Sequence, residues 1–230
     1  MKLPISKRLL ACCGFVAPGE RVADIGCDHG YLSIYLLTQG IARSVIAADI
    51  REQPLLSAVR NAQKFGVRDR IEFYLSDGVR SIPRDFDTMV CAGMGADTMI
   101  SIIEAAPWLK RSAYRLILQC QSKSHMLRRY LSKHGWRITE ESVLRDGRFL
   151  YTVMEVYYEP DYPRLTVGQW YFPPAMLENP GRETVEYYRQ TISRLERAAL
   201  GTDGAVIQAL AELKALAQNP DLTFLKEDKS

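Results

Sequence analysis

Long apolar runs are missing from this sequence of 230 residues. None approaches the roughly 18–20 consecutive apolar residues that a helix needs to cross a bilayer. The N-terminal residues 1–8 also contain no uninterrupted apolar stretch and no cleavage site of small residues, so no signal peptide is predicted. We therefore expect a cytoplasmic protein with no membrane partner.

Disulfide and metal-binding patterns are absent as well. The cysteines are odd in number and form no C-x-x-C pair, and the histidines at positions 29, 125 and 134 show no zinc spacing. The sequence therefore predicts no metal site. We expect reduced, partly buried thiols at Cys12, Cys13, Cys27, Cys91 and Cys120.

Composition favours an ordinary globular protein. Apolar residues make up 47% and charged residues 25% of the chain, and both values are near the average for globular domains. A chain of this length can bury a substantial core, which excludes wholesale disorder. It allows one large domain, or a medium domain with a small appendage, and we expect a monomer.

Positive charge is concentrated in the middle third of the sequence. Between Lys110 and Tyr151 lie ten basic residues and three acidic ones, whereas from Glu178 to the end seven basic residues accompany nine acidic ones. This uneven distribution favours a polyanion as the partner of the middle third.

Short β-branched runs alternate with longer helical stretches between Arg21 and Gln119. The pattern predicts strands at 21–26, 45–49, 70–75, 87–92 and 114–119, and helices at 31–39, 53–65, 97–106 and 123–134. Strands and helices in alternation imply parallel strands with right-handed crossovers. The expected fold class is therefore α/β, with an open doubly wound sheet.

The pattern changes after this region. Two β-rich runs at 136–144 and 148–158 are joined at Arg145-Asp146-Gly147, which is a strong hairpin signal. A connector rich in proline and aromatic residues follows at 160–177. Two amphipathic helices are then predicted at 182–200 and 204–217, with a turn at 201–204, and they form an antiparallel hairpin. We expect the tail after Pro220 to fray.

Acidic residues and glycines follow three of the predicted strands. The first strand leads into D-I-G-C-D-H-G-Y at 24–31, where Gly26 is expected to need a φ that other residues do not tolerate. This is not the G-x-G-x-x-G fingerprint of dinucleotide sites. Asp49 ends the second strand, where an acid can bind both ribose hydroxyls, and Ser76-Asp77-Gly78 suits an adenine amino group. Carboxylates in this order favour S-adenosylmethionine, which carries an ammonium and a sulfonium.

The predicted cofactor-binding residues share the edge of the sheet where the parallel strands end, because ligands of open α/β sheets bind in that crevice. They are Asp24, Gly26, Cys27, Asp28, Gly30, Tyr31, Asp49, Ile50, Ser76, Asp77, Gly78, Ala92 and Gly93.

Three motifs are more specific than a glycine turn. Residues 24–32 read D-I-G-C-D-H-G-Y-L, residues 92–96 read A-G-M-G-A after the fourth strand, and residues 116–121 read L-I-L-Q-C-Q in the fifth. From the N-terminal helix to the hairpin, the chain resembles the bacterial tRNA (adenine-22-N1)-methyltransferase family (TrmK). It departs from the family pattern by small-for-small changes at Cys27, Gly30, Ser33, Ala96 and Cys120.

The resemblance implies a class I, Rossmann-like methyltransferase domain whose seven-stranded, mostly parallel sheet ends in an antiparallel hairpin, followed by a helical coiled-coil domain. We expect the methyltransferase domain at 1–159, the connector at 160–177 and the helical domain at 178–230. The resemblance also implies an enzyme that transfers a methyl group from S-adenosylmethionine to N1 of adenine 22 in the D-arm region of tRNA, giving 1-methyladenosine.

Methylation at N1 needs alignment more than a strong base, because N1 carries its own lone pair. The base must be swung out of its pair, and a carboxylate can stabilise the cationic product. We expect Asp28, Gly93 and Met94 to be catalytic, with Asp28 contacting the target base or the cofactor. The backbone of 92–95 is expected to accept a hydrogen bond from the adenine amino group, and His29 to cap or pack.

Phosphate contacts supply most nonspecific affinity for nucleic acid. The expected tRNA-binding residues are Lys7, Arg8, Lys123, Arg128, Arg129, Arg145 and Arg148. The alternatives are methyl transfer to another RNA or to a small molecule, and a noncatalytic RNA-binding protein. A nicotinamide oxidoreductase is disfavoured because the phosphate fingerprint is missing and the sheet is expected to end in a hairpin.

Overall fold

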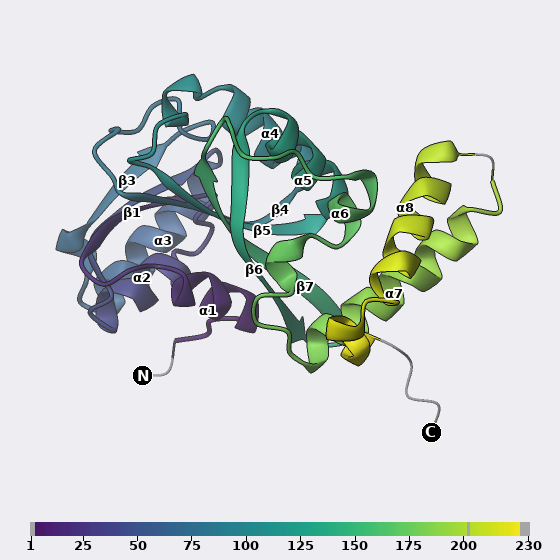
Figure 1. Ribbon diagram of the computed structural model, residues 1–230. Helices are drawn as coiled ribbons and strands as arrows, with labels where there is room; N and C mark the ends of the chain where they lie inside the picture. The colour runs from purple at the N-terminus through teal and green to yellow at the C-terminus, as the bar shows by residue number, and fades with distance from the viewer. Residues whose placement is uncertain (1–2, 202, 226–230) are drawn as a thin grey trace.

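Seven strands form one sheet in the computed structural model, which describes residues 3–201 and 203–225 (Figure 1). In chain order they are β1 (Glu20–Ile25), β2 (Ala42–Asp49), β3 (Ile71–Leu75), β4 (Thr88–Gly95), β5 (Arg115–Ser122), β6 (Trp136–Asp146) and β7 (Phe149–Tyr158). The order across the sheet is β3-β2-β1-β4-β5-β7-β6. The first five of these strands are parallel, and β7 is antiparallel to both β5 and β6. The predicted α/β class and the final hairpin are therefore confirmed.

The helices follow the predicted alternation. They are α1 (Lys7–Gly14), α2 (Tyr31–Thr38), α3 (Glu52–Lys64), α4 (Ala96–Glu104), α5 (Ser124–Lys133), α6 (Val167–Tyr171), α7 (Arg182–Ala198) and α8 (Gly204–Leu216). Short 3-10 helices lie at η1 (Arg68–Arg70), η2 (Pro107–Leu109), η3 (Pro174–Met176) and η4 (Pro220–Leu225). None of these helices in the described part of the chain is long and apolar enough to span a membrane.

Both faces of the parallel sheet are covered by helices, because apolar side chains of its strands point to both faces. On one face, Met99 of α4 and Leu127 of α5 pack in a core shared with β4 and β5. On the other, Cys12 of α1, Leu32 of α2 and Ala58 of α3 pack in a second core. All five cysteines are buried thiols, more deeply buried than the sequence predicts.

A third core joins the last two long helices to the connector. It contains Phe172, Tyr188 of α7 and Leu213 of α8, and α7 and α8 lie beside the sheet as a pair (Figure 1). The turn predicted between them at 201–204 includes Thr202, which lies outside the described residues. Fraying was predicted for the tail, but its described part at 220–225 is ordered, since η4 begins at Pro220 and Leu225 is 2% exposed in this core. Residues 226–230 lie outside the described part of the chain.

The connector contains a short helix, α6, that is held at both ends by charged side chains from other elements. At its N-terminus, Glu212 of α8 accepts hydrogen bonds from the Thr166 hydroxyl (2.6 Å) and the Gly168 N–H (2.7 Å). At its C-terminus, Arg128 of α5 donates to the carbonyl oxygens of Trp170 (3.0 Å) and Tyr171 (3.2 Å). These charges complement the helix dipole at each end.

Arg128 is fully buried, which corrects the prediction that it contacts RNA. Its Nη2 lies 2.7 Å from Oε1 of Glu141 on β6, and both side chains have zero exposure. The same guanidinium donates to the Tyr187 hydroxyl of α7 at 3.2 Å. Burying an arginine without a partner is very costly, so the pair with Glu141 is required for this placement.

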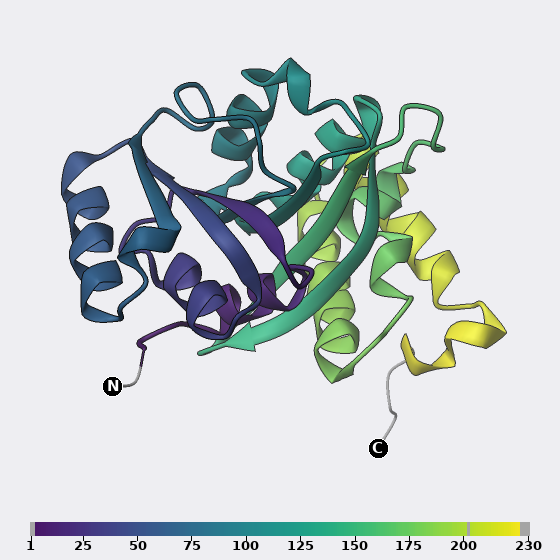
Figure 2. The same cartoon turned by 90° about the vertical axis from the view of Figure 1, so that its left-hand side faces the viewer.

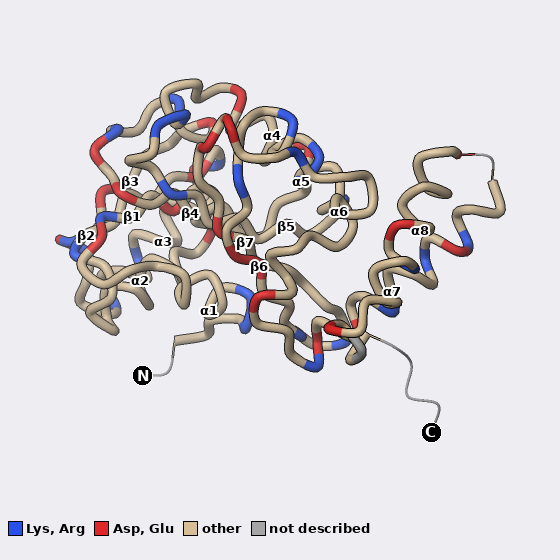
Figure 3. Tube along the Cα trace, viewed as in Figure 1, with Lys and Arg blue, Asp and Glu red and all other residues tan. Residues whose placement is uncertain are grey.

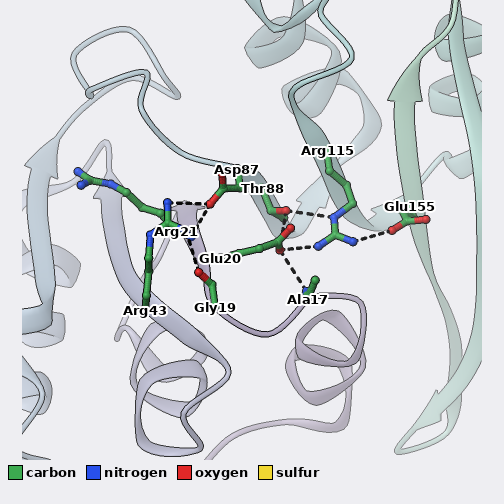
Figure 4. Close-up of polar contacts among 9 residues, drawn as sticks. All are labelled: Ala17, Gly19, Glu20, Arg21, Arg43, Asp87, Thr88, Arg115 and Glu155. Atoms are coloured by element: carbon green, nitrogen blue, oxygen red, sulfur yellow. Dashed lines mark hydrogen bonds and ion pairs between the residues drawn. The ribbon is translucent and has the colours of Figure 1, made fainter.

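A polar network crosses the sheet at the amino ends of its parallel strands (Figure 4). Arg115 of β5 forms ion pairs with Glu20 of β1 and, at 3.1 Å, with Glu155 of β7. Its Nε donates to the Thr88 hydroxyl of β4 at 3.1 Å. One guanidinium therefore links four strands at the edge opposite to their carboxyl ends.

Candidate active site

A cleft of about 730 Å³ lies at the carboxyl ends of the parallel strands. It is centred where the strand order reverses between β1 and β4, which is where open α/β sheets bind ligands. Residues that follow β1, β2 and β3 line one half of it. The other half is lined by the ends of β4 and β5 and by the start of α4, and α1 contributes Ser6, Arg8 and Leu9.

The turn after β1 is shaped by left-handed backbone at Gly26 and Asp28. Gly26 has a φ of +74°, and a Cβ there would lie 2.2 Å from the Met94 Cε, so the predicted need for glycine is confirmed. Asp28 has a φ of 49°, which is uncommon for a residue with a side chain. The N–H groups of Gly26 and Cys27 both donate to the Ala48 carbonyl oxygen, at 2.8 and 2.9 Å. This turn is therefore fixed against β2.

Two carboxyl groups lie at the base of the cleft with little exposure. Asp24 is 3% exposed, and its Oδ2 accepts a hydrogen bond from the Ser33 hydroxyl at 2.6 Å. Burial raises the pKa of Asp24 to about 6, against the opposing effect of the Ser33 hydroxyl. Asp49 is 5% exposed, and its two oxygens accept from the Arg51 N–H (2.9 Å) and the Asp28 N–H (3.1 Å). Asp49 therefore joins the end of β2 to the turn after β1.

The segment after β3 adds a third carboxylate. The Ser76 hydroxyl accepts a hydrogen bond from the Ser81 N–H at 3.1 Å, so it stabilises this loop. Asp77 lines the cleft and forms an ion pair with Arg80, whose Nε lies 3.1 Å from Oδ2. Gly78 has a φ of +57°, and a Cβ there would lie 2.9 Å from Ile102.

Two glutamines of β5 lie beside the turn that ends β4. Gln119 is 1% exposed, and its Oε1 accepts from the Gly93 N–H at 3.0 Å. Gln121 is exposed and lines the cleft. Neither residue is among the predicted site residues, although their spacing of two places both on one face of a strand. That spacing, in L-I-L-Q-C-Q, is the signal that could have identified them.

Arg8 of α1 lines the cleft on the side of the N-terminal helix. Its Nε lies 3.2 Å from Oδ2 of Asp146, and its guanidinium carbon lies 4.8 Å from the centre of the Tyr151 ring. Asp146 and Tyr151 belong to the β6–β7 hairpin, whose long curved strands are visible in Figure 2. The cleft therefore borders on a contact between α1 and the hairpin.

The structure brings most of the predicted site residues to this cleft. Its lining includes Asp24, Gly26, Cys27, Asp28, Asp49, Ile50, Ser76, Asp77, Gly78, Ala92, Gly93 and Met94. Gly30 and Tyr31 are not part of the lining. Gly30 instead approaches Ala58, whose Cβ would be 2.9 Å from a Cβ at position 30, and the Tyr31 ring lies 5.7 Å from that of His29. Sequence reasoning missed Arg51, Arg80, Asp97 and Thr98, which also line the cleft.

The residues predicted to bind RNA are placed in different surroundings. Lys7, Arg129 and Arg148 are exposed. Lys123 pairs with Asp97 at 2.8 Å, and Arg145 pairs with Glu186 of α7. Figure 3 shows basic and acidic positions interspersed along the chain. Ion pairs therefore neutralise part of the positive charge counted in the middle third. Among the described residues, no group of three or more side chains could hold a metal ion.

Comparison with known proteins gives consistent matches. Residues 5–154 match the family described as "Methyltransferase domain". The tRNA (adenine(22)-N(1))-methyltransferase of Bacillus subtilis (strain 168) is 32% identical over 154 residues, which cover 66% of this chain and 65% of that protein. The ribosomal protein L11 methyltransferase of Thermotoga neapolitana is 30% identical over 134 residues, 57% of this chain and 49% of that protein. The chain thus matches less than two thirds of the length of either relative.

Solved structures extend the match over nearly the whole chain. The B. subtilis m1A22 tRNA methyltransferase TrmK superposes with a TM-score of 0.76 and 25% identity, covering 98% of this chain and 100% of that one. A Streptococcus pneumoniae protein, provisionally assigned as a tRNA (m1A22) methyltransferase and solved in complex with S-adenosyl-L-methionine, gives a TM-score of 0.81 and 28% identity. That superposition covers 92% of this chain and 99% of the other.

Proposed function

The chain belongs to the methyltransferase domain family, and we propose that it transfers a methyl group from S-adenosylmethionine to N1 of adenine 22 in tRNA. The observation that carries the proposal is the carboxylate-lined cleft at the point where the strand order reverses, formed by Asp24, Asp28, Asp49 and Asp77. The m1A22 assignment of the similar B. subtilis enzyme supports the choice of substrate. The product would be 1-methyladenosine.

The residues of the cleft fit this cofactor. Carboxylates suit the ammonium group and the ribose hydroxyls, and a cleft of about 730 Å³ is within the usual range for small-molecule sites. A Cβ at Gly26 would collide with Met94, so glycine is needed there for Met94 to pack against the turn at the cleft. We assign Asp24 to the ammonium group, Asp49 to the ribose and Asp77 to the adenine amino group. When bound, the cofactor supplies an electrophilic methyl carbon, and the electrons of its carbon–sulfur bond remain on sulfur.

The protein's part in the reaction is to position the target base and to exclude water. N1 attacks with its own lone pair, and no proton leaves it, so the ring becomes a cation. Asp28 is exposed at the cleft, where its carboxylate can stabilise this charge. The backbone carbonyls of 92–95 accept from the hydrogen of the amino group that lies next to N1. The Gly93 N–H, which Gln119 already binds, fixes the direction of this turn.

Contacts with the tRNA backbone are assigned to cations that are exposed, half-buried or beside the cleft. They are Lys7, Arg8, Lys123, Arg129, Arg145 and Arg148. We place the methyltransferase domain at 1–159, the connector at 160–177 and the helical domain at 178–230. We further propose that the protein acts as a monomer in the cytoplasm, where tRNA is available.

Incubation with labelled S-adenosylmethionine and unmodified total tRNA tests the proposal. We expect label in tRNA, and mapping of the modified nucleotide by primer extension should place it at adenine 22. The Asp28→Ala variant should bind the cofactor but transfer the methyl group more slowly. Label at another nucleotide, or no label in tRNA, would contradict the proposal. Full activity of the Asp28→Ala variant would remove Asp28 from the mechanism.

A further inference from the structure

Gln121 is a polar side chain in the cleft that the proposed chemistry does not yet use. It lies near the end of β5, is exposed, and lines the cleft. Its Nε2 lies 3.6 Å from the place that a Cβ on Gly93 would occupy, so the amide faces the turn after β4. Within the described part of the chain, this amide forms no hydrogen bond.

The contrast with Gln119 shows that Gln121 is not needed to hold the turn. Gln119 is buried, accepts from the Gly93 N–H at 3.0 Å and donates to the Cys120 carbonyl oxygen at 3.3 Å. Its amide is therefore satisfied within the protein. Gln121 lies two residues further along the same strand and offers one donor and one acceptor group to whatever enters the cleft.

The two halves of the cleft are formed by different elements. The half formed after β1, β2 and β3 contains Asp24, Asp49 and Asp77, which the proposed function assigns to the cofactor. The half formed by the ends of β4 and β5 and the start of α4 contains the Gly93 turn, Gln121 and Asp97, whose carboxylate pairs with Lys123 at 2.8 Å. With the cofactor in the first half, the acceptor base enters the second half, beside Gln121.

We propose that Gln121 reads the Hoogsteen edge of the target adenine, an inference that rests on the proposed function. A glutamine amide matches this edge in a bidentate way, because Oε1 accepts from N6–H and Nε2 donates to N7. This pairing leaves N1, on the Watson–Crick edge, open to the methyl group. It also leaves the second N6 hydrogen for the backbone carbonyls of 92–95. Gln121 is thus a specificity-determining residue that orients the base.

The test is a thermodynamic cycle, like a double-mutant cycle, in which one change is made in the enzyme and the other in the substrate. Wild type and the Gln121→Leu variant are assayed on tRNA carrying adenosine or 7-deazaadenosine at the target position. The analogue replaces N7 by C–H and keeps N1 and the amino group. We expect the analogue to lower kcat/KM of the wild type roughly 2- to 12-fold more than that of the variant, by removing one of the two hydrogen bonds. Its effect on the reactivity of N1 is common to both enzymes, so it cancels in the cycle.

For the Gln121→Leu variant, the analogue should cause no such additional loss. The Gln121→Glu variant tests the same contact in the opposite direction, since its carboxylate repels the N7 lone pair of adenosine but not the C–H of the analogue. The ratio of kcat/KM on the analogue to kcat/KM on adenosine should therefore be higher for this variant than for the wild type. Gln63→Leu is the matched control, because Gln63 is an exposed glutamine of α3 outside the cleft. Calorimetry with S-adenosylhomocysteine checks that each variant is folded and binds the cofactor product.

Two results would overturn the inference, and they differ from each other. If the wild type methylates adenine and the analogue has the same effect on wild type and on Gln121→Leu, Gln121 does not read this edge. If the wild type binds S-adenosylhomocysteine but methylates no adenine in tRNA, the proposed function fails and the inference fails with it.

Discussion

Asp24 makes the cleft sensitive to pH. Burial raises its pKa to about 6, so the carboxyl group is largely protonated at pH 5 and ionised at pH 8. A ligand ammonium pairs only with the ionised form. We expect the affinity for S-adenosylhomocysteine to rise as pH increases through 6 and to be about ten-fold lower at pH 5 than at pH 8. Calorimetry at each pH measures this change, and proton release below pH 6 should accompany binding.

The Asp24→Asn variant is the control for this prediction. It should bind more weakly than wild type at pH 8 and lose the dependence on pH. Without ligand, the raised pKa means that the folded state binds more protons than the unfolded state between about pH 4 and pH 6. The wild type should therefore lose stability relative to the variant as pH rises through this range. Affinity that does not change with pH would show that Asp24 does not pair with the ligand.

Gly26 can be tested against a glycine of similar backbone conformation. Gly19 has a φ of +82° and nothing within 4 Å of an added Cβ, whereas at Gly26 the added Cβ would lie 2.2 Å from Met94. We expect Gly19→Ala to cost about 1 kcal/mol through backbone strain alone. Gly26→Ala should cost about 1–3 kcal/mol more, since Met94 must move, and it should weaken cofactor binding. Chemical denaturation and calorimetry measure both effects, and equal losses in the two variants would refute this steric account.

Individual site residues can be predicted from the sequence where they directly follow a buried strand. Glycines and acids directly after buried strands led to Gly26, Asp24 and Asp49, because the ends of parallel strands meet at one edge. Gly30 and Tyr31 were included because they lie in the same motif. The start of α2, however, turns them toward α3 and His29.

Gln121 and Arg128 show what cannot be predicted from the sequence alone. Position along a strand does not reveal which glutamine is buried, and composition does not show that Arg128 faces Glu141 rather than solvent. Both facts depend on contacts between elements that are distant in the sequence.

At the scale of elements, the contact between α5, α6 and β6 depends on Arg128. Replacing it with Met should destabilise the protein by about 3–5 kcal/mol, because Glu141 would remain buried and charged without a partner. The double variant Arg128→Met/Glu141→Leu should recover most of this loss. Denaturant unfolding of the two variants measures the difference. A single variant as stable as wild type would show that the pair does not hold this contact.

The long elements follow from local patterns, whereas α6 has one local signal, the capping box of Thr166 and Gln169 at its N-terminus. The β6–β7 hairpin follows from Asp146-Gly147, and α7 and α8 follow from their apolar stripes. Helix α6 has five residues, too few to be stable alone, and its ends are satisfied by Arg128 and Glu212. No local pattern in the connector could predict such partners, and for the same reason the order found after Pro220 was missed.

At the scale of the whole molecule, we expect the network around Arg115 to contribute to stability but not to activity. It links β1, β4, β5 and β7 at the edge of the sheet opposite to the cleft (Figure 4). Arg115→Met should lower the free energy of unfolding by about 1–3 kcal/mol, less than a fully buried pair would, since these side chains are partly exposed. Methyl transfer by the folded variant should remain at the wild-type level. A loss of kcat without a loss of stability would contradict this separation.

The clamped connector has a consequence for how large substrates are chosen. Because Glu212 of α8 and Arg128 of α5 bind the two ends of α6, this short helix ties the paired helices to the helix layer on the sheet. Any elongated ligand that contacted both the far end of these helices and the cleft would have to match the distance between them in its own structure.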